Sequence, residues 1–192
     1  MKLLSSRSLA LLGAVLLPSS PLCAQNDHSH YRIDPAATTI TARVTFFGLA
    51  AKTAGFPAVS GGIALDPNRP EAIALDIVLD ARQLTAGDSV TLARLKGPKF
   101  FDVAHYPEVR FVGTRMTLGQ GNSAHITGTL TARGVTRPVV LSALFAAPPR
   151  PGEPLSLAAT TAIDRRDFGM TAYPFIVGSK VRITISARMA PD

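Results

Sequence analysis

Hydrophobic and polar residues alternate along most of the chain that follows residue 30. Between residues 38 and 47, single polar residues separate an apolar set, which is Ile40, Ala42, Val44 and Phe46. Successive side chains of a β-strand point to opposite faces, so this period of two predicts a strand with one buried and one solvated face. The same alternation recurs in residues 60–66, 72–81, 107–118, 125–134, 137–146, 154–163 and 180–190. The pattern therefore predicts about eight strands.

Short runs of turn-forming residues separate these predicted strands. Residues 66–68, 119–122 and 148–152 read DPN, GQGN and PPRPG, compositions that are typical of turns. Strands joined by short turns run antiparallel, whereas a parallel pair needs a longer crossover, usually a helix. No segment shows a helical pattern long enough for such crossovers, so we expect no parallel sheet. An all-β fold follows, either a closed barrel or a two-sheet sandwich.

One segment, residues 87–97, breaks the alternation. Asp88 or Ser89 can cap the N-terminus of a helix, two leucines follow three residues apart, and Gly97 favours the C-terminal end. We therefore expect one short amphipathic α-helix at about residues 89–96, which lies over the sheet or caps the barrel.

The predicted helix runs directly into KFFDVAHYPEVRF, residues 99–111. Neighbouring residues on a strand face opposite sides, so Phe100 and Phe101 cannot both fill one sheet core. We expect one ring to reach inward and the other to pack under the helix. The alternative is a hydrophobic latch on the wall with no contact to a ligand.

The N-terminal residues 1–24 have the pattern of a secretory signal peptide, with a basic start, a short apolar run and small residues before Ala24. The apolar run is too short to cross a bilayer, which takes about 20 residues. Cys23 is the only cysteine, and a lipid-modified cysteine is the alternative, but the bulky Leu22 before it favours cleavage after Ala24. We expect residues 25–192 to form a single secreted domain without disulfides.

The formal net charge of the chain is +7, and its basic residues are scattered singly, so nucleic acid is not an expected partner. A transient contact with an anionic membrane surface stays open. The four histidines show no HxxxH or HExxH spacing, and no nucleophile or phosphate-binding motif occurs. A copper or nickel site at His28 is the alternative, and it requires cleavage one residue later, before Asn26. We therefore predict no catalytic residues and no metal. The densest charge cluster, Asp164 to Asp167, is either a salt-bridge corner or a polar anchor for a pocket.

Several stretches together resemble the YceI-like family of small secreted bacterial proteins. They are YRIDPAATTI (31–40), GFPAVSGGIALDP (55–67), the helix with KFFDVAHYPEVRF (90–111), GTLTARGVTRPVVL (128–141), IDRRDFGM (163–170) and VGSKVRITI (177–185). The resemblance implies an extended, lipocalin-like, eight-stranded antiparallel barrel with one capping helix. It also implies a periplasmic protein without catalytic activity, whose interior holds a long-chain isoprenoid or similar amphiphilic lipid. A homodimer stays open.

In such a barrel the inward positions of the predicted strands are the expected lipid contacts. They are Val44, Phe46, Ile63, Leu75, Ile77, Phe111, Ile126, Leu130, Ile163 and Ile183. We expect a second set at the capped end, namely Leu92, Leu95, Phe100, Phe101 and Tyr106. No cofactor is expected besides the lipid ligand. For each residue the alternative is plain core packing, because small barrels are often filled by their own side chains.

The expected function is binding, storage or transport of a polyprenyl chain or an isoprenoid quinone in the periplasm. One alternative is an enzyme that acts on a bound quinone-like lipid, with residues 164–166 or Tyr173 near the head group. The other is an interaction module whose barrel is solid and which pairs through an exposed strand edge.

Overall fold

The computed structural model describes residues 29–66, 69, 71–150 and 152–192. The predicted signal peptide and its cleavage site lie outside these residues.

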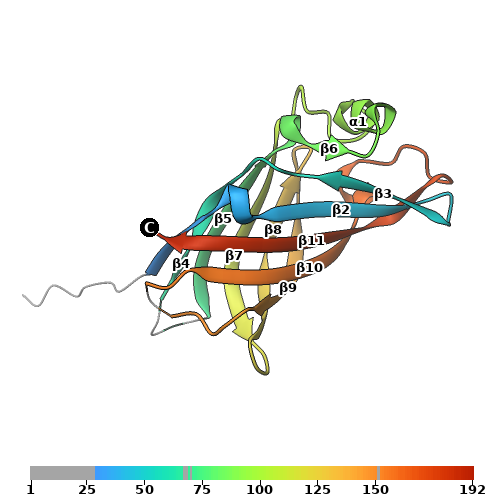
Figure 1. Ribbon diagram of the computed structural model, residues 1–192. Coiled ribbons are helices and arrows are strands. Elements are labelled where there is room, and N and C mark those ends of the chain that lie inside the picture. The colour runs from blue at the N-terminus through green and yellow to red at the C-terminus, as the bar shows by residue number, and fades with distance from the viewer. Residues whose placement is uncertain (1–28, 67–68, 70, 151) are drawn as a thin grey trace, which may run out of the picture.

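One antiparallel sheet contains all the strands of the described chain and curls into a barrel (Figure 1). The strands are β1 (Ser29–Ile33), β2 (Thr39–Phe46), β3 (Ala50–Gly55), β4 (Val59–Leu65), β5 (Ala72–Asp80), β6 (Thr85–Ala86), β7 (Glu108–Leu118), β8 (Ser123–Ala132), β9 (Val135–Phe145), β10 (Leu155–Asp164) and β11 (Val177–Pro191). Their order is β1-β4-β5-β7-β8-β9-β10-β11-β2-β3-β6, and a further pairing of β1 with β11 closes the ring.

Three of the eight positions in the barrel wall are occupied by strands that bend and are interrupted. β1 and β2 pair with successive parts of β11, and a 3-10 turn at Pro35–Ala37 separates them. The next position is shared in the same way, with β4 paired to β1 and β3 paired to β2. The position after it is shared by β5, which pairs with β4, and β6, which pairs with β3. The predicted eight-stranded antiparallel barrel is therefore confirmed, and the sandwich alternative is not the observed fold.

The wall is incomplete on one side, at the end of the barrel that carries the helix. In the described residues β6 pairs only with β3, while β7 pairs with β5 and β8, so no ladder joins β6 to β7. The chain between β6 and β7 forms helix α1 (Ser89–Lys96) and a loop at this opening (Figure 1). Asp88 caps the helix by accepting a hydrogen bond from the Thr91 N–H at 2.7 Å. The helix predicted at about residues 89–96 is confirmed.

The alternation seen in the sequence places apolar side chains inside the barrel. On β9, Val139, Leu141, Ala143 and Phe145 are buried, while the residues between them are exposed. These buried side chains, from nearly all of the strands, form one hydrophobic core inside the barrel.

Candidate functional site

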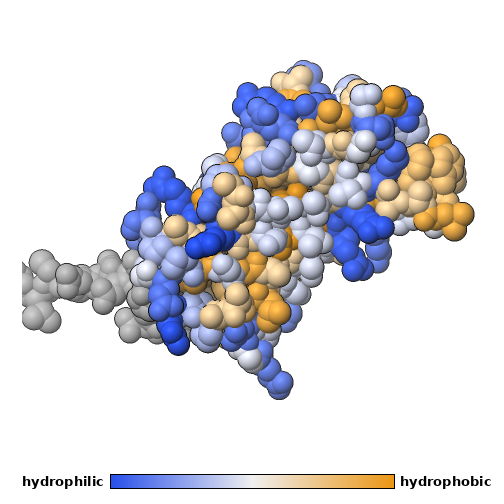
Figure 2. Space-filling view, viewed as in Figure 1, coloured by the Kyte–Doolittle hydropathy of each residue, from blue (hydrophilic) through white to orange (hydrophobic). Residues whose placement is uncertain are grey.

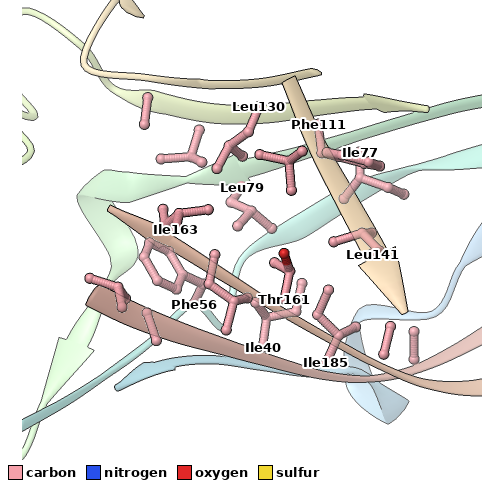
Figure 3. Close-up of a pocket in the computed structure, with 18 of the residues that line it drawn as sticks. Ile40, Phe56, Ile77, Leu79, Phe111, Leu130, Leu141, Thr161, Ile163 and Ile185 are labelled. Atoms are coloured by element: carbon pink, nitrogen blue, oxygen red, sulfur yellow. The ribbon is translucent and has the colours of Figure 1, made fainter. Parts of the chain in front are cut away.

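An apolar cavity lies along the interior of the barrel. Every described residue that lines it is apolar except Thr161 and Arg165. In Figure 3 the labelled side chains, which come from several strands, point toward one another, and the hydroxyl of Thr161 is the oxygen among them. Water gains few hydrogen bonds in such a space, so the cavity suits an apolar ligand.

The cavity is long and narrow. On β11 its wall includes Val181, Met189 and every second residue between them, a stretch of about 26 Å at the usual rise of a strand. With the tilt of about 40° that barrel strands adopt, this corresponds to about 20 Å along the barrel axis. The space between the lining atoms is about 1190 Å³ including the part open to solvent, and the centre of a water molecule can reach about 160 Å³ of it. The shape accommodates a slender chain better than a bulky compact ligand.

The structure brings part of the predicted lipid-contacting set together around this cavity. These residues are Leu75, Ile77, Phe101, Phe111, Ile126, Leu130, Ile163 and Ile183. They come from β5, β7, β8, β10, β11 and the loop after α1, elements that are far apart in the sequence. That they contact a lipid stays a prediction.

The rest of the predicted set lies outside the cavity wall. Ile63 is buried in the core, and Val44 and Phe46 are half-buried toward the end of β2. Leu92 and Leu95 of α1 are likewise half-buried and pack against the core. All five face the inside of the barrel or the underside of the helix, as predicted. None of them lines the cavity.

The two remaining members of that set are Phe100 and Tyr106. Phe100 is buried, whereas Tyr106 is 39% exposed and packs beside Gly134 in the β8–β9 turn. Tyr106 therefore covers the outside of the barrel end.

The adjacent phenylalanines of the loop after α1 separate to different sides. Phe101 lines the cavity and packs edge to face on Phe56, with 5.7 Å between ring centroids. Phe100 stacks on Tyr173, with centroids 6.2 Å apart, and the Arg165 guanidinium lies 5.9 Å from its ring. One ring thus closes the cavity and the other attaches the loop to the segment before β11.

Among the described residues, Arg165 is the one charged residue in the cavity wall, and it is only 4% exposed. Its guanidinium donates hydrogen bonds to the carbonyl oxygens of Gly178 (2.9 Å), Val177 (2.8 Å) and Met170. Burial lowers the pKa of Arg165 from its ordinary value. An arginine nevertheless stays protonated in proteins, so this end of the cavity carries a positive charge held by main-chain oxygens.

The charge cluster at positions 164–166 was predicted to be either a salt-bridge corner or a polar anchor for a pocket, and its residues take both roles. Arg166 donates hydrogen bonds to the Asp164 carboxylate, and this interaction holds the pKa of Asp164 well below its usual range. This pair is a surface salt bridge, while Arg165 faces the cavity. The cavity wall also contains many residues that the predicted set omitted, among them Phe56, Thr161, Arg165, Phe168 and Met170. Three of these five, Arg165, Phe168 and Met170, lie in the stretch IDRRDFGM. That family-like motif was the sequence feature that could have identified them.

The described residues contain no group of three or more histidine, cysteine, aspartate or glutamate side chains that could hold a metal ion. His105 contacts Asp102 at 3.0 Å on the surface, and His125 lies on the outer face of β8. No helix in the same part of the chain is both long and apolar enough to cross a membrane.

A closed antiparallel barrel around an elongated apolar cavity belongs to the class of β-barrels that can enclose a ligand. The chain belongs to one family within that class, because the model of the YceI-like domain matches residues 31–189.

Curated relatives are similar over most of their length. A UPF0312 protein of Pseudomonas putida (strain GB-1) is 29% identical over 164 residues, which cover 83% of each chain. A UPF0312 protein of Vibrio parahaemolyticus is 26% identical over 167 residues, covering 84% of this chain and 87% of the relative.

Solved structures share the fold. Burkholderia cenocepacia BcnA superposes with a TM-score of 0.73 at 21% identity, over 81% of this chain and 98% of that one. A polyisoprenoid binding domain from Saccharophagus degradans, implicated in plant cell wall breakdown, gives a TM-score of 0.67 at 14% identity, over 86% of this chain and all of that one. At these identities the likeness establishes the architecture alone.

Proposed function

We propose that the protein binds one long-chain isoprenoid-type lipid, a polyprenyl chain or an isoprenoid quinone, inside its barrel. The observation that carries this proposal is the continuous apolar cavity along the barrel interior. Membership of the YceI-like family supports it, as does the shared fold with a domain described as polyisoprenoid binding. The role is that of a binding protein which stores or transports its ligand.

The length of the cavity limits how much of the lipid it encloses. An extended isoprene unit spans about 5 Å, given a carbon–carbon bond of about 1.5 Å. A cavity of about 20 Å therefore encloses about four units. Each five-carbon unit gains up to about 4 kcal/mol on leaving water, so four units give about 16 kcal/mol before the cost of ordering the chain. This sum is below the ceiling of about 20 kcal/mol for non-covalent binding.

The polar residues indicate which way round the lipid lies. Arg165 lies at the end of the cavity near α1, where it contacts the Phe100 ring of the loop after the helix. Thr161 pairs with Ile183 and lies between this end and the middle. Ile33 and Met189, which pair with each other, line the opposite end with apolar atoms. Main-chain oxygens accept hydrogen bonds from three of the five N–H groups of Arg165. The oxygen-bearing head group therefore belongs at the Arg165 end, and the tail belongs toward Met189.

The proposed location is the periplasm. The signal-like residues 1–24 support it, because a protein exported with such a segment meets the lipids of the cell envelope. Determination of the N-terminus of protein purified from the periplasmic fraction tests this step, and an N-terminus at Gln25 is expected.

Extraction of the freshly purified protein tests the ligand. Native mass spectrometry should show a complex close to one lipid per chain, and organic extraction should release a molecule whose fragments differ by five-carbon units. A quinone head group would add its characteristic ultraviolet absorbance. Recovery of no stoichiometric lipid, together with failure of added polyprenols to bind, would contradict the proposal.

A further inference from the structure

Large apolar side chains are exposed together at one end of the barrel. Leu49 is 99% exposed, Phe175 is 98% exposed and Phe47 is 63% exposed. Figure 2 shows a hydrophobic surface at the end where the β2–β3 turn and the segment before β11 lie in Figure 1. We call these three residues the apolar tip. Such a concentration of apolar surface marks an interaction site more often than scattered single residues do.

The main chain holds the apolar tip in a defined shape. The Phe47 N–H donates a hydrogen bond to the Ile176 carbonyl at 2.8 Å, which joins the β2–β3 turn to the segment before β11. Phe47 has a φ of 51°, in the left-handed region that bulky residues rarely adopt. The chain therefore accepts an unfavourable backbone conformation at an aromatic residue that points into solvent.

The apolar tip is close to the polar end of the cavity. Val177 pairs with Phe46 next to the tip, and its carbonyl accepts a hydrogen bond from Arg165 of the cavity wall. The cavity wall on β11 begins at Val181, four residues further along, a distance of at most about 13 Å. A surface that covered the tip would face the end of the barrel where the cavity has its charged residue.

Cationic side chains lie behind the apolar tip. Arg43 and Arg182 are directly opposite each other on β2 and β11, and Lys180 is two residues closer to the tip. Lys99 and Arg94 lie 5.4 and 5.8 Å from the ring centroid of Tyr173, two residues before Phe175 of the tip. Within the described residues none of these five forms an ion pair with a carboxylate. Exposed apolar residues backed by cations match the chemistry of an anionic bilayer surface.

We propose that the apolar tip inserts into the interfacial region of an anionic lipid bilayer, with the cations contacting the lipid head groups. The tip would then place the α1 end of the barrel against the membrane. The membrane-binding step stands on the tip itself. Its purpose, the loading or release of the barrel's lipid, rests on the proposed function.

Vesicle flotation with the purified processed protein tests this proposal. The test variant is Phe47→Asn, Leu49→Ser and Phe175→Ser combined, because asparagine tolerates the left-handed backbone at position 47. The matched control combines Leu118→Ser, Val140→Ser and Leu144→Ser, which remove exposed apolar side chains of β7 and β9 that are not part of the tip. The vesicles are phosphatidylethanolamine with phosphatidylglycerol, and phosphatidylcholine alone serves for comparison.

The wild-type protein should float with the anionic vesicles at least tenfold better than with the neutral ones. The tip variant should lose at least tenfold in its partition to anionic vesicles, whereas the control should stay within twofold of the wild type. Equal partition of wild type and tip variant would overturn the proposal, as would a wild type that binds no vesicles. A wild-type dimer that the tip variant converts to a monomer, without vesicle binding, would show instead that the tip joins two copies of the chain.

Lipid content measured on the same samples separates the two proposals. The tip variant should retain the lipid of the wild type, because none of its substitutions lies in the cavity wall. Vesicle binding by a protein that contains no lipid and takes up no polyprenol would support the membrane-docking tip and refute the proposed function. Normal lipid content without vesicle binding would support the proposed function and refute the membrane-docking tip.

Discussion

The substitution Ala159→Phe should divide the cavity in two. Ala159 lies in the wall, is 2% exposed and pairs with Ile185 on β11. Ile185 is halfway along the β11 wall, between Val181 and Met189. A phenyl ring that projects inward from position 159 would therefore occupy the middle of the cavity and leave room for only about half of the chain that the wild type encloses.

The loss of binding can be estimated from the cavity length. Half of about 20 Å is about 10 Å, or about two isoprene units, and burial of these units is worth about 8 kcal/mol before costs. Ordering of the chain offsets much of this gain. If only a quarter of it survives in the measured affinity, about 2 kcal/mol remains, and this amounts to about 30-fold in the dissociation constant.

A series of isoprenyl chains of two to six units, measured by native mass spectrometry or fluorescent displacement, provides the assay. Wild-type affinity should rise up to about four units and then level off, whereas Ala159→Phe should level off at about two. The control is Ala158→Phe, one residue away and exposed on the outer face of β10, which should bind as the wild type does. Because the added ring enters empty space, the free energy of unfolding should be unchanged or higher by about 1 kcal/mol.

The reasoning fails if Ala159→Phe binds a four-unit chain as tightly as the wild type while remaining folded. The ligand would then lie elsewhere, or the cavity would be wider than its lining residues indicate. A wild-type affinity that does not depend on chain length would also refute it, because burial of successive units is the assumed source of the binding energy.

Three further predictions concern the cavity entrance and the helix. Arg165→Met should lower the free energy of unfolding by about 2–4 kcal/mol in denaturant titrations, because three carbonyls lose their buried donor. Arg166→Gln, at the exposed pair with Asp164, should leave it nearly unchanged. Phe101→Asp should reduce recovered lipid at least tenfold by placing a carboxylate in the apolar wall. Phe100→Asp, outside that wall, should reduce it less. Equal recovery from Phe101→Asp and wild type would remove Phe101 from the site. Hydrogen bonds from Lys52 and from the N-terminus of α1 hold the pKa of Asp88 below its ordinary value, so the cap's stabilisation is present above about pH 4 and is lost as the pH falls toward that lowered pKa. The protection of the α1 amides, measured against the intrinsic exchange rate at each pH, should therefore fall at acidic pH, and Asp88→Asn should remove most of this dependence.

The strands and the helix were predictable because their signals are local. Alternation with a period of two needs only neighbouring residues, and it placed Leu75, Ile126 and Ile183 on the inner face that the structure shows. The helix was bounded by a cap and a terminal glycine within a single short segment. The joining of bent strands into a barrel was suggested by resemblance, since pairing between distant strands has no signature within any one of them.

Neighbouring residues with the same local pattern had different fates in the folded chain. Arg165 and Arg166 are indistinguishable by residue type, but the short 3-10 turn directs the first into the cavity and the second to Asp164 on the surface. Val44 and Phe46 have the inward phase of their strand, but β2 extends past the cavity, so they lie near the apolar tip. Alternation along a strand shows which side chains face inward. It does not show how far along the barrel axis each of them lies.

The amino-acid sequence by itself determined which side of each strand is apolar, where helix α1 begins and ends, and that the described chain is built mainly of β-strands. Only the tertiary structure decided that the inner side chains leave a continuous space and that exposed aromatic residues gather beside its charged end. The physical reason is that the space depends on the barrel's closure and on the sizes of side chains facing each other across it. These residues are separated by tens of positions along the chain, so no local pattern records their distance.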